Sequence, residues 1–164
     1  MNPSSRFVVA THILAGMHCV KNLKGMDSVT SDFLADGVNT NPVVIRRLLG
    51  QLRKAGLVES HAGSKGGFSL AKPTDRITLL DVYRATEVGS LFHFHYTEPN
   101  QACPIGCTIQ KSLMNVCSEA ESAVEGVLEA KTIAMLADDM ISNPTFREKA
   151  DEAIAAGIAP GILS

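Results

Sequence analysis

Apolar residues recur at helical spacing in three segments near the start of the chain. The first segment follows Asn2-Pro3, a pair that can cap and open a helix, and it predicts a helix over residues 3–22. A second, short helix is expected over residues 31–36, ended by Gly37, and a third from Pro42 to a C-terminal cap at Gly56. A short helix, a tight turn and a longer helix in this order are typical of a helix-turn-helix unit. The apolar stripe of the third helix consists of Ile45, Leu48, Leu49, Leu52 and Ala55.

A Gly-rich turn follows the third helix and joins two short strand candidates. These strands, at residues 57–60 and 67–70, predict a β-hairpin, and a hairpin directly after a helix-turn-helix is a wing with Lys65 near its tip. Gly-rich loops also bind nucleotide phosphates, but residues 63–67 match neither common phosphate-binding pattern and do not open a helix. Thr78 is expected to cap a fourth helix.

The second half of the chain carries a different pattern. Its apolar and small residues alternate steps of four and three, which is a heptad register. We therefore expect a dimerisation helix over residues 108–140, and a single-chain core helix is the alternative. Residues 141–164 are expected to form a short helix around 145–156 and a loose tail. The heptad positions are Ile109, Leu113, Val116, Ala120, Ala123, Val127, Ala130 and Ala134.

Residues 89–107 are expected to connect these two regions and are a candidate sensory segment. The alternating residues 91–96 indicate a strand or an extended connection. On a strand His93 and His95 would share one face, as a metal-binding pair or, as the simpler alternative, as two ordinary polar residues.

The order of elements predicts a mostly α-helical fold with a small β-hairpin wing: a winged helix-turn-helix domain over residues 1–88 plus a long dimerisation helix. Four blocks within it, NPVVIRRLL (41–49), LRKAGLV (52–58), GGFSLA (66–71) and ITLLDVY (77–83), resemble the Rrf-two (Rrf2) family of bacterial winged-helix transcription regulators. The sequences NTNPVV (39–44) and CPIG (103–106) are similar to its YwnA-like branch. The resemblance implies a homodimeric, sequence-specific DNA-binding protein.

Composition changes this picture in two ways. With 45% hydrophobic residues the chain can bury a core, but it has no run of 18 apolar residues, so no membrane partner is expected. The first residues lack the pattern of a secretory signal, and with four cysteines this favours a reducing, cytoplasmic location.

The net charge of −2 hides an asymmetry between the two parts of the chain. Residues 1–76 hold ten basic and five acidic residues, and residues 77–164 hold five basic and twelve acidic residues. This predicts an electropositive face on the first part, unless the charges are segregated by chance.

The expected DNA-binding residues lie on and before the third helix. If the apolar stripe of this helix faces the core, its other face is exposed. From that face Arg46 or Arg47 can read a guanine edge and Val43 can contact a thymine methyl group. Residues 39–41 precede the helix N-terminus, where free N–H groups favour phosphate. The alternative is that these arginines only solvate a surface helix. The full candidate set is Asn39, Thr40, Asn41, Val43, Arg46, Arg47, Lys54 and Lys65.

Three cysteines lie close together at positions 103, 107 and 117. The resemblance implies an iron–sulfur cluster as one alternative, because some family members carry three ligating cysteines in this region. Here, however, the spacing of the cysteines is uneven and Cys117 falls inside the helix. Cys107 lies near a helix N-terminus, which favours a thiolate, so Cys103 and Cys107 form a candidate redox switch. The third alternative is that the cysteines are structural. We expect no cofactor and no metal site.

Together these features favour a homodimeric transcription regulator that binds a palindromic operator in double-stranded DNA, with a redox or ligand input. The alternative is a winged-helix metal or redox carrier, or a protein-interaction module, without a DNA target. An enzyme is not expected, because no nucleophile–base set or cofactor loop is visible in the sequence.

Overall fold

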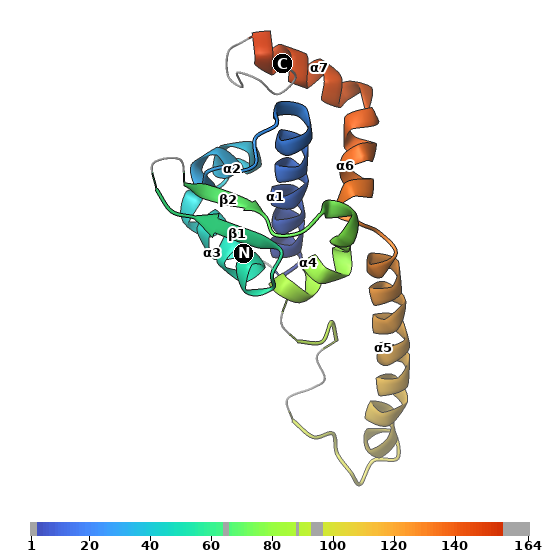
Figure 1. The fold of residues 1–164 in the computed structure, drawn as a ribbon. Helices are drawn as coiled ribbons and strands as arrows, with labels where there is room; N and C mark the ends of the chain where they lie inside the picture. The colour runs from blue at the N-terminus through green and yellow to red at the C-terminus, as the bar shows by residue number, and fades with distance from the viewer. Residues whose placement is uncertain (1–2, 64–65, 88, 93–96, 156–164) are drawn as a thin grey trace.

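The computed structural model describes residues 3–63, 66–87, 89–92 and 97–155 (Figure 1). The three expected N-terminal helices are present as α1 (Pro3–Lys24), α2 (Ser31–Val38) and α3 (Pro42–Lys54). The expected end of α2, after residue 36 with Gly37 as its cap, is wrong by two residues, because the helix runs to Val38. Instead Asn39 adopts the left-handed conformation, at φ 55°, and its N–H bonds the carbonyls of Ala35 and Asp36. Asparagine tolerates this conformation, so it ends the helix in place of glycine.

The predicted wing is a two-stranded antiparallel hairpin of β1 (Val58–His61) and β2 (Gly67–Leu70). A further bridge joins β2 to the segment before α2, where Val29 and Phe68 exchange both backbone hydrogen bonds, at 2.9 and 2.8 Å. This approach requires glycine at position 67, because a Cβ there would lie 2.7 Å from the carbonyl oxygen of Val29. The wing is therefore anchored to the helix-turn-helix at its base.

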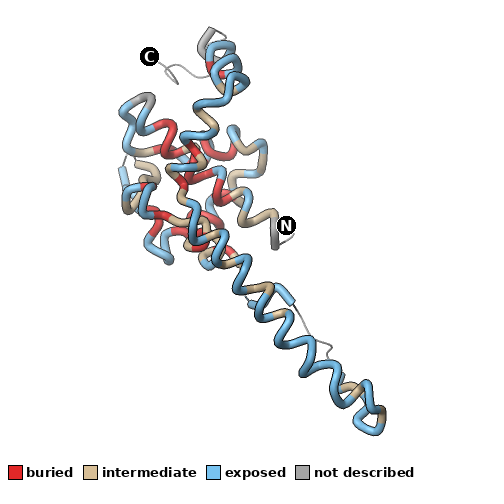
Figure 2. The backbone as a smooth tube through the Cα atoms, turned by 90° about the vertical axis from the view of Figure 1, so that its right-hand side faces the viewer, coloured by how far each residue is buried: buried red, intermediate tan, exposed pale blue. Residues whose placement is uncertain are grey.

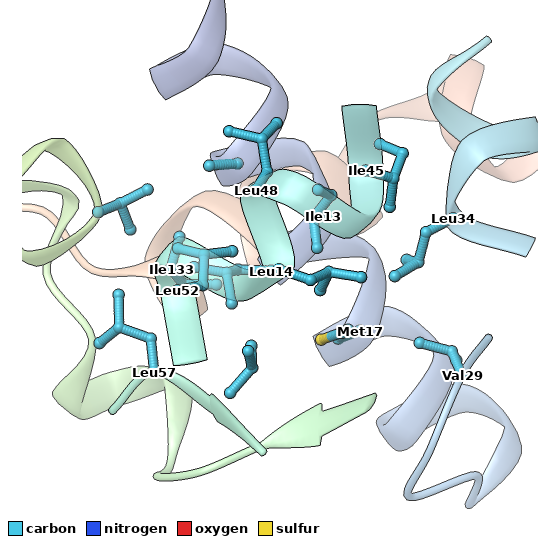
Figure 3. Close-up of a cluster of buried hydrophobic side chains, with 14 of the residues drawn as sticks. Ile13, Leu14, Met17, Val29, Leu34, Ile45, Leu48, Leu52, Leu57 and Ile133 are labelled. Atoms are coloured by element: carbon cyan, nitrogen blue, oxygen red, sulfur yellow. The ribbon is translucent and has the colours of Figure 1, made fainter. Parts of the chain in front are cut away.

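The core forms where α1, α2 and α3 meet beneath the wing (Figure 3). Ile13 and Leu14 of α1 pack with Ile45 and Leu49 of α3, and all four side chains are fully buried. This is the stripe that the sequence predicted for α3, and it fixes which face of that helix remains outside. Buried side chains that complete the core include Leu34, Leu48, Leu52, Leu57, Ile77 and Ile133.

A short 3₁₀ turn, η1 (Thr74–Arg76), leads from the wing to α4 (Leu79–Thr86). Thr78 caps α4 as predicted, and it does so as a capping box: its hydroxyl accepts from the N–H of Asp81, and the Asp81 carboxylate accepts from the N–H of Thr78. The cap fixes the residue at which α4 begins.

The expected single helix over residues 108–140 is wrong. The structure has two helices there, α5 (Gly106–Glu129) and α6 (Ile133–Ser142). Between them the chain pairs with the start of α4: Leu79 N–H donates to the Lys131 carbonyl at 2.8 Å, and Ile133 N–H donates to the Ile77 carbonyl at 2.9 Å. Thr132 caps α6, and Ile133 is fully buried in the core. Burying Ile133 is the physical reason for the break, because it seats α6 against α1.

Helix α5 projects away from the winged-helix body and has no buried residue (Figure 2). Polar contacts of two α5 side chains, Glu125 and Glu121, hold its inner end. Arg84 of α4 forms an ion pair with Glu125 at 2.8 Å, and the Glu121 carboxylate accepts hydrogen bonds from the Ser90 hydroxyl and the Leu91 N–H. The segment after α4 is thereby attached to α5.

The last described helix, α7 (Pro144–Ala155), lies within one residue of the bounds expected for the C-terminal helix. The predicted tail after residue 156 lies outside the described residues, as do His93 and His95. In the part of the chain that the structure describes, no helix is long and apolar enough to cross a membrane.

Candidate nucleic-acid interface

The outer face of α3 is exposed along its length. Asn41 caps the helix, its side-chain oxygen accepting from the N–H of Val43 at 2.8 Å. Val43 is 62% exposed although it is apolar. An exposed helix face beside a wing is the arrangement in which a recognition helix contacts base edges in the major groove of DNA.

The two central arginines of α3 differ in their surroundings. The Arg46 guanidinium lies 3.4 Å from the Ser31 hydroxyl and 3.6 Å from the Asp32 carboxylate, both in the first turn of α2. Arg47 makes no hydrogen bond or ion pair with any described residue, and it is exposed. Arg46 is thus oriented by α2, whereas Arg47 is free to reach outward.

The residues before α3 form the turn of the helix-turn-helix. Asn39 is exposed and holds the left-handed conformation, while Thr40 is half-buried. Asn41 is exposed too, although capping α3 occupies its side-chain oxygen. Lys54 is exposed in the last turn of α3, and Lys65 lies outside the described residues. Seven of the eight candidate residues thus lie in the turn and in α3.

Sequence reasoning missed two contacts that position this surface. Arg53 of α3 donates to the Ser60 hydroxyl of β1 at 3.0 Å, which links the recognition helix to the wing. Asp32 of α2 orients Arg46. The arginines are visible in the sequence, but their partners are brought to them only by the fold.

The two candidate redox cysteines lie in one turn at the start of α5. The Cys103 thiol is half-buried and accepts backbone hydrogen bonds from Gly106 and Ile105, which lower the pKa of Cys103 below its usual value. The Cys107 thiol is exposed and donates to the Pro104 carbonyl at 3.3 Å. By contrast, burial and the nearby Asp138 carboxylate raise the pKa of Cys19. The thiolate of Cys103 is therefore more stabilised than that of Cys19.

Comparison with known proteins gives a consistent result. Residues 3–139 match the Rrf2 family, described as an iron-dependent transcriptional regulator. The chain is 40% identical to a Bacillus subtilis protein named as the putative HTH-type transcriptional regulator YwnA, over 79% of this chain and 92% of the relative.

Solved structures agree with this match. A crystal structure titled as a putative DNA-binding protein is 35% identical, with 80% of this chain and 97% of that chain covered and a TM-score of 0.63. The oxidized form of Staphylococcus aureus CymR is 26% identical, with 84% and 96% covered and a TM-score of 0.60. IscR of T. potens is 25% identical, with 85% of each chain covered and a TM-score of 0.58.

The family's description names iron, so we tested whether the cysteines fit an iron site. Cys107 and Cys117 stand ten positions apart on α5, which separates them by about 15 Å along the helix axis. In the described ranges, no three Cys, His, Asp or Glu side chains of the chain come together as metal ligands would. The described residues of one chain therefore do not fit an iron or iron–sulfur site, and no step is assigned to iron.

The fold, the exposed recognition helix and wing, and the family match over most of the chain point to one class of protein. The chain belongs to the Rrf2 family and is a winged-helix, DNA-binding transcription regulator.

Proposed function

We propose that two copies of the chain together bind a palindromic operator in double-stranded DNA, each inserting α3 into the major groove of one half-site. The observation that carries this proposal is the exposed outer face of α3, whose opposite face is packed into the core. The excess of five positive charges in residues 1–76 supports it, because phosphate contacts supply much of the affinity for DNA. The target is reached in the cytoplasm, and the proposal assigns no catalysis to the chain.

Within this proposal the exposed residues have different tasks. Arg47 contacts a base edge, since it is exposed and makes no hydrogen bond or ion pair with a described residue. Arg46, held by Asp32, contacts the phosphate backbone and fixes the register of α3. Val43 meets a thymine methyl group, and Lys65 lies on the backbone or in the minor groove. Asn39, Thr40, Asn41 and Lys54 complete the phosphate-facing edge.

The second copy is proposed to pair through α5. Ile109, Leu113, Val116 and Val127 follow the heptad register and are between 41% and 65% exposed. A row of exposed aliphatic side chains on a projecting helix marks a protein–protein contact. Pairing along this row, called the α5 stripe below, would hold the two recognition helices about one DNA turn, or ~34 Å, apart.

Cys103 and Cys107 are proposed as a redox input to the regulator. A peroxide would oxidise the Cys103 thiolate to a sulfenic acid, and the Cys107 thiol would then displace water to form a disulfide. The lowered pKa of Cys103 and the position of both thiols in one turn support this order. The existence of an oxidized form of the related S. aureus CymR is also consistent with it.

Equilibrium binding to genomic fragments tests the DNA proposal. We expect one class of fragment to bind specifically, with log affinity falling linearly with log salt concentration at about −0.9 per phosphate contacted. Lys111→Ala, which removes an exposed charge of α5, should leave that slope unchanged and serves as the control. If no fragment is preferred, the proposal of a palindromic operator is refuted.

A further inference from the structure

A cavity of about 420 Å³ lies between α1, α2 and α7, away from α3 and the wing. Its volume falls within the range of about 300–1,000 Å³ that is usual for small-molecule sites. The walls are almost wholly apolar. They include Ile13 and Val20 of α1, Phe33 and Val38 of α2, and Phe146 of α7. Figure 1 shows α7 crossing above the C-terminal end of α1, and residues of α7 line one side of the cavity.

Two glycines keep the cavity open. Gly16 in the middle of α1 and Gly37 in α2 both line it, and a Cβ built on either would meet no atom within 4 Å. Glycine inside a helix is destabilising relative to alanine, so it is normally used where space is short. Here the space is available, and no side chain of the residues that the structure describes fills it. The chain therefore carries a preformed void at a cost in helix stability.

The charges at the cavity favour an anion. Among the described lining residues, His12 and Lys149 are the ionisable groups that can carry a positive charge, and none of these residues is a carboxylate. Lys149 forms an exposed ion pair with Glu152 at 2.5 Å, and an ammonium group has further N–H donors to offer. Thr145 places the N-terminal, positive end of α7 at the same cavity.

We propose that this cavity binds a small hydrophobic carboxylic acid, with its apolar body between α1, α2 and α7 and its carboxylate at His12 and Lys149. The site lies on the first helix of the helix-turn-helix, since four lining residues belong to α2 and Val38 directly precedes the turn to α3. A ligand that changes the position of α2 against α1 also changes the position of α3 relative to the DNA. The regulatory consequence rests on the proposed DNA-binding function, whereas the binding site does not.

Decanoate is the probe, with decanol as its uncharged counterpart, and titration calorimetry of the full chain is the measurement. We expect the wild type to bind decanoate in a one-to-one ratio and Gly16→Leu, which fills the cavity, to lose this binding. Lys149→Met should weaken decanoate binding by about tenfold and leave decanol unchanged, because only the charge-assisted hydrogen bond is removed. Lys111→Met, an exposed lysine of α5, is the matched control and should change neither.

Circular dichroism establishes that Gly16→Leu is folded; if it is not, the comparison of Lys149→Met with Lys111→Met decides. The proposal is overturned if the wild type binds no decanoate, or if Lys149→Met and Lys111→Met behave alike. A double variant, Ile162→Asp with Leu163→Asp, tests whether the chain's own C-terminal residues occupy the cavity. The proposal is overturned if only this variant binds decanoate. A decanoate effect on operator affinity that Gly16→Leu abolishes would support the coupling. Intact DNA binding without decanoate binding would refute this inference alone.

Discussion

Charged substitutions in the α5 stripe should separate the proposed dimer. Leu113 and Val116 are 45% and 62% exposed in the single chain, so about half of each side chain remains to be covered by a partner. Full burial of such a side chain contributes about 1.5–3 kcal/mol, which leaves about 1 kcal/mol for each and about 4 kcal/mol for the four side chains of a symmetric pair. Losing this alone raises the dissociation constant by about a thousandfold, and burying the new charges adds to the effect.

The matched variant Asn115→Glu with Ser118→Glu adds two charges at the same spacing on a different, exposed face of α5. Sedimentation velocity at micromolar concentration should show a dimer for the wild type and this control, and a monomer for Leu113→Glu with Val116→Glu. Operator binding should be lost with the dimer. The reasoning fails if the stripe variant still sediments as a dimer, or if both double variants dissociate equally.

Three further predictions concern separate parts of the molecule. Arg47→Ala should cost about 1–3 kcal/mol of operator affinity in gel shifts, while Arg147→Ala on α7 should cost none; equal losses would remove Arg47 from base reading. The pKa of Cys103 is lowered and that of Cys19 is raised, and the thiolate is the reactive form of a cysteine. Alkylation by iodoacetamide, followed by mass spectrometry, should therefore reach half its maximal rate at a lower pH for Cys103 than for Cys19. The opposite order would contradict the hydrogen bonds assigned to Cys103. Ile133→Ala should destabilise the fold by about 2–5 kcal/mol in urea unfolding and the half-exposed Met135→Ala by much less; similar values would show that α6 is not seated through Ile133.

The sequence could predict those elements whose signal is local. The stripe of α3 identifies its buried face, and with it the exposed set around Arg46 and Arg47, because helical geometry leaves no other choice. Thr78 and Asp81 similarly define the start of α4 by their own spacing. These interactions span only a few residues, so no knowledge of the fold is needed to find them.

The features that the sequence did not reveal depend on distant partners. The heptad pattern continues through Ala130 and Ala134, yet the helix breaks there because Lys131 and Ile133 pair with residues 77–79. That pairing joins segments about fifty residues apart and leaves no periodic signal. The same is true of the Val29–Phe68 bridge and of the Asp32 contact that orients Arg46.

Selection of bound sequences from randomised duplex DNA by the purified full chain tests the central claim most directly. Two α3 helices held by one α5 pair should select an inverted repeat whose half-site centres lie about one helical turn, or ~10 base pairs, apart. Arg47→Ala should relax the preference at one symmetric pair of positions within that repeat. Enrichment of a single asymmetric half-site, or no enrichment at all, would contradict a homodimeric operator-binding regulator.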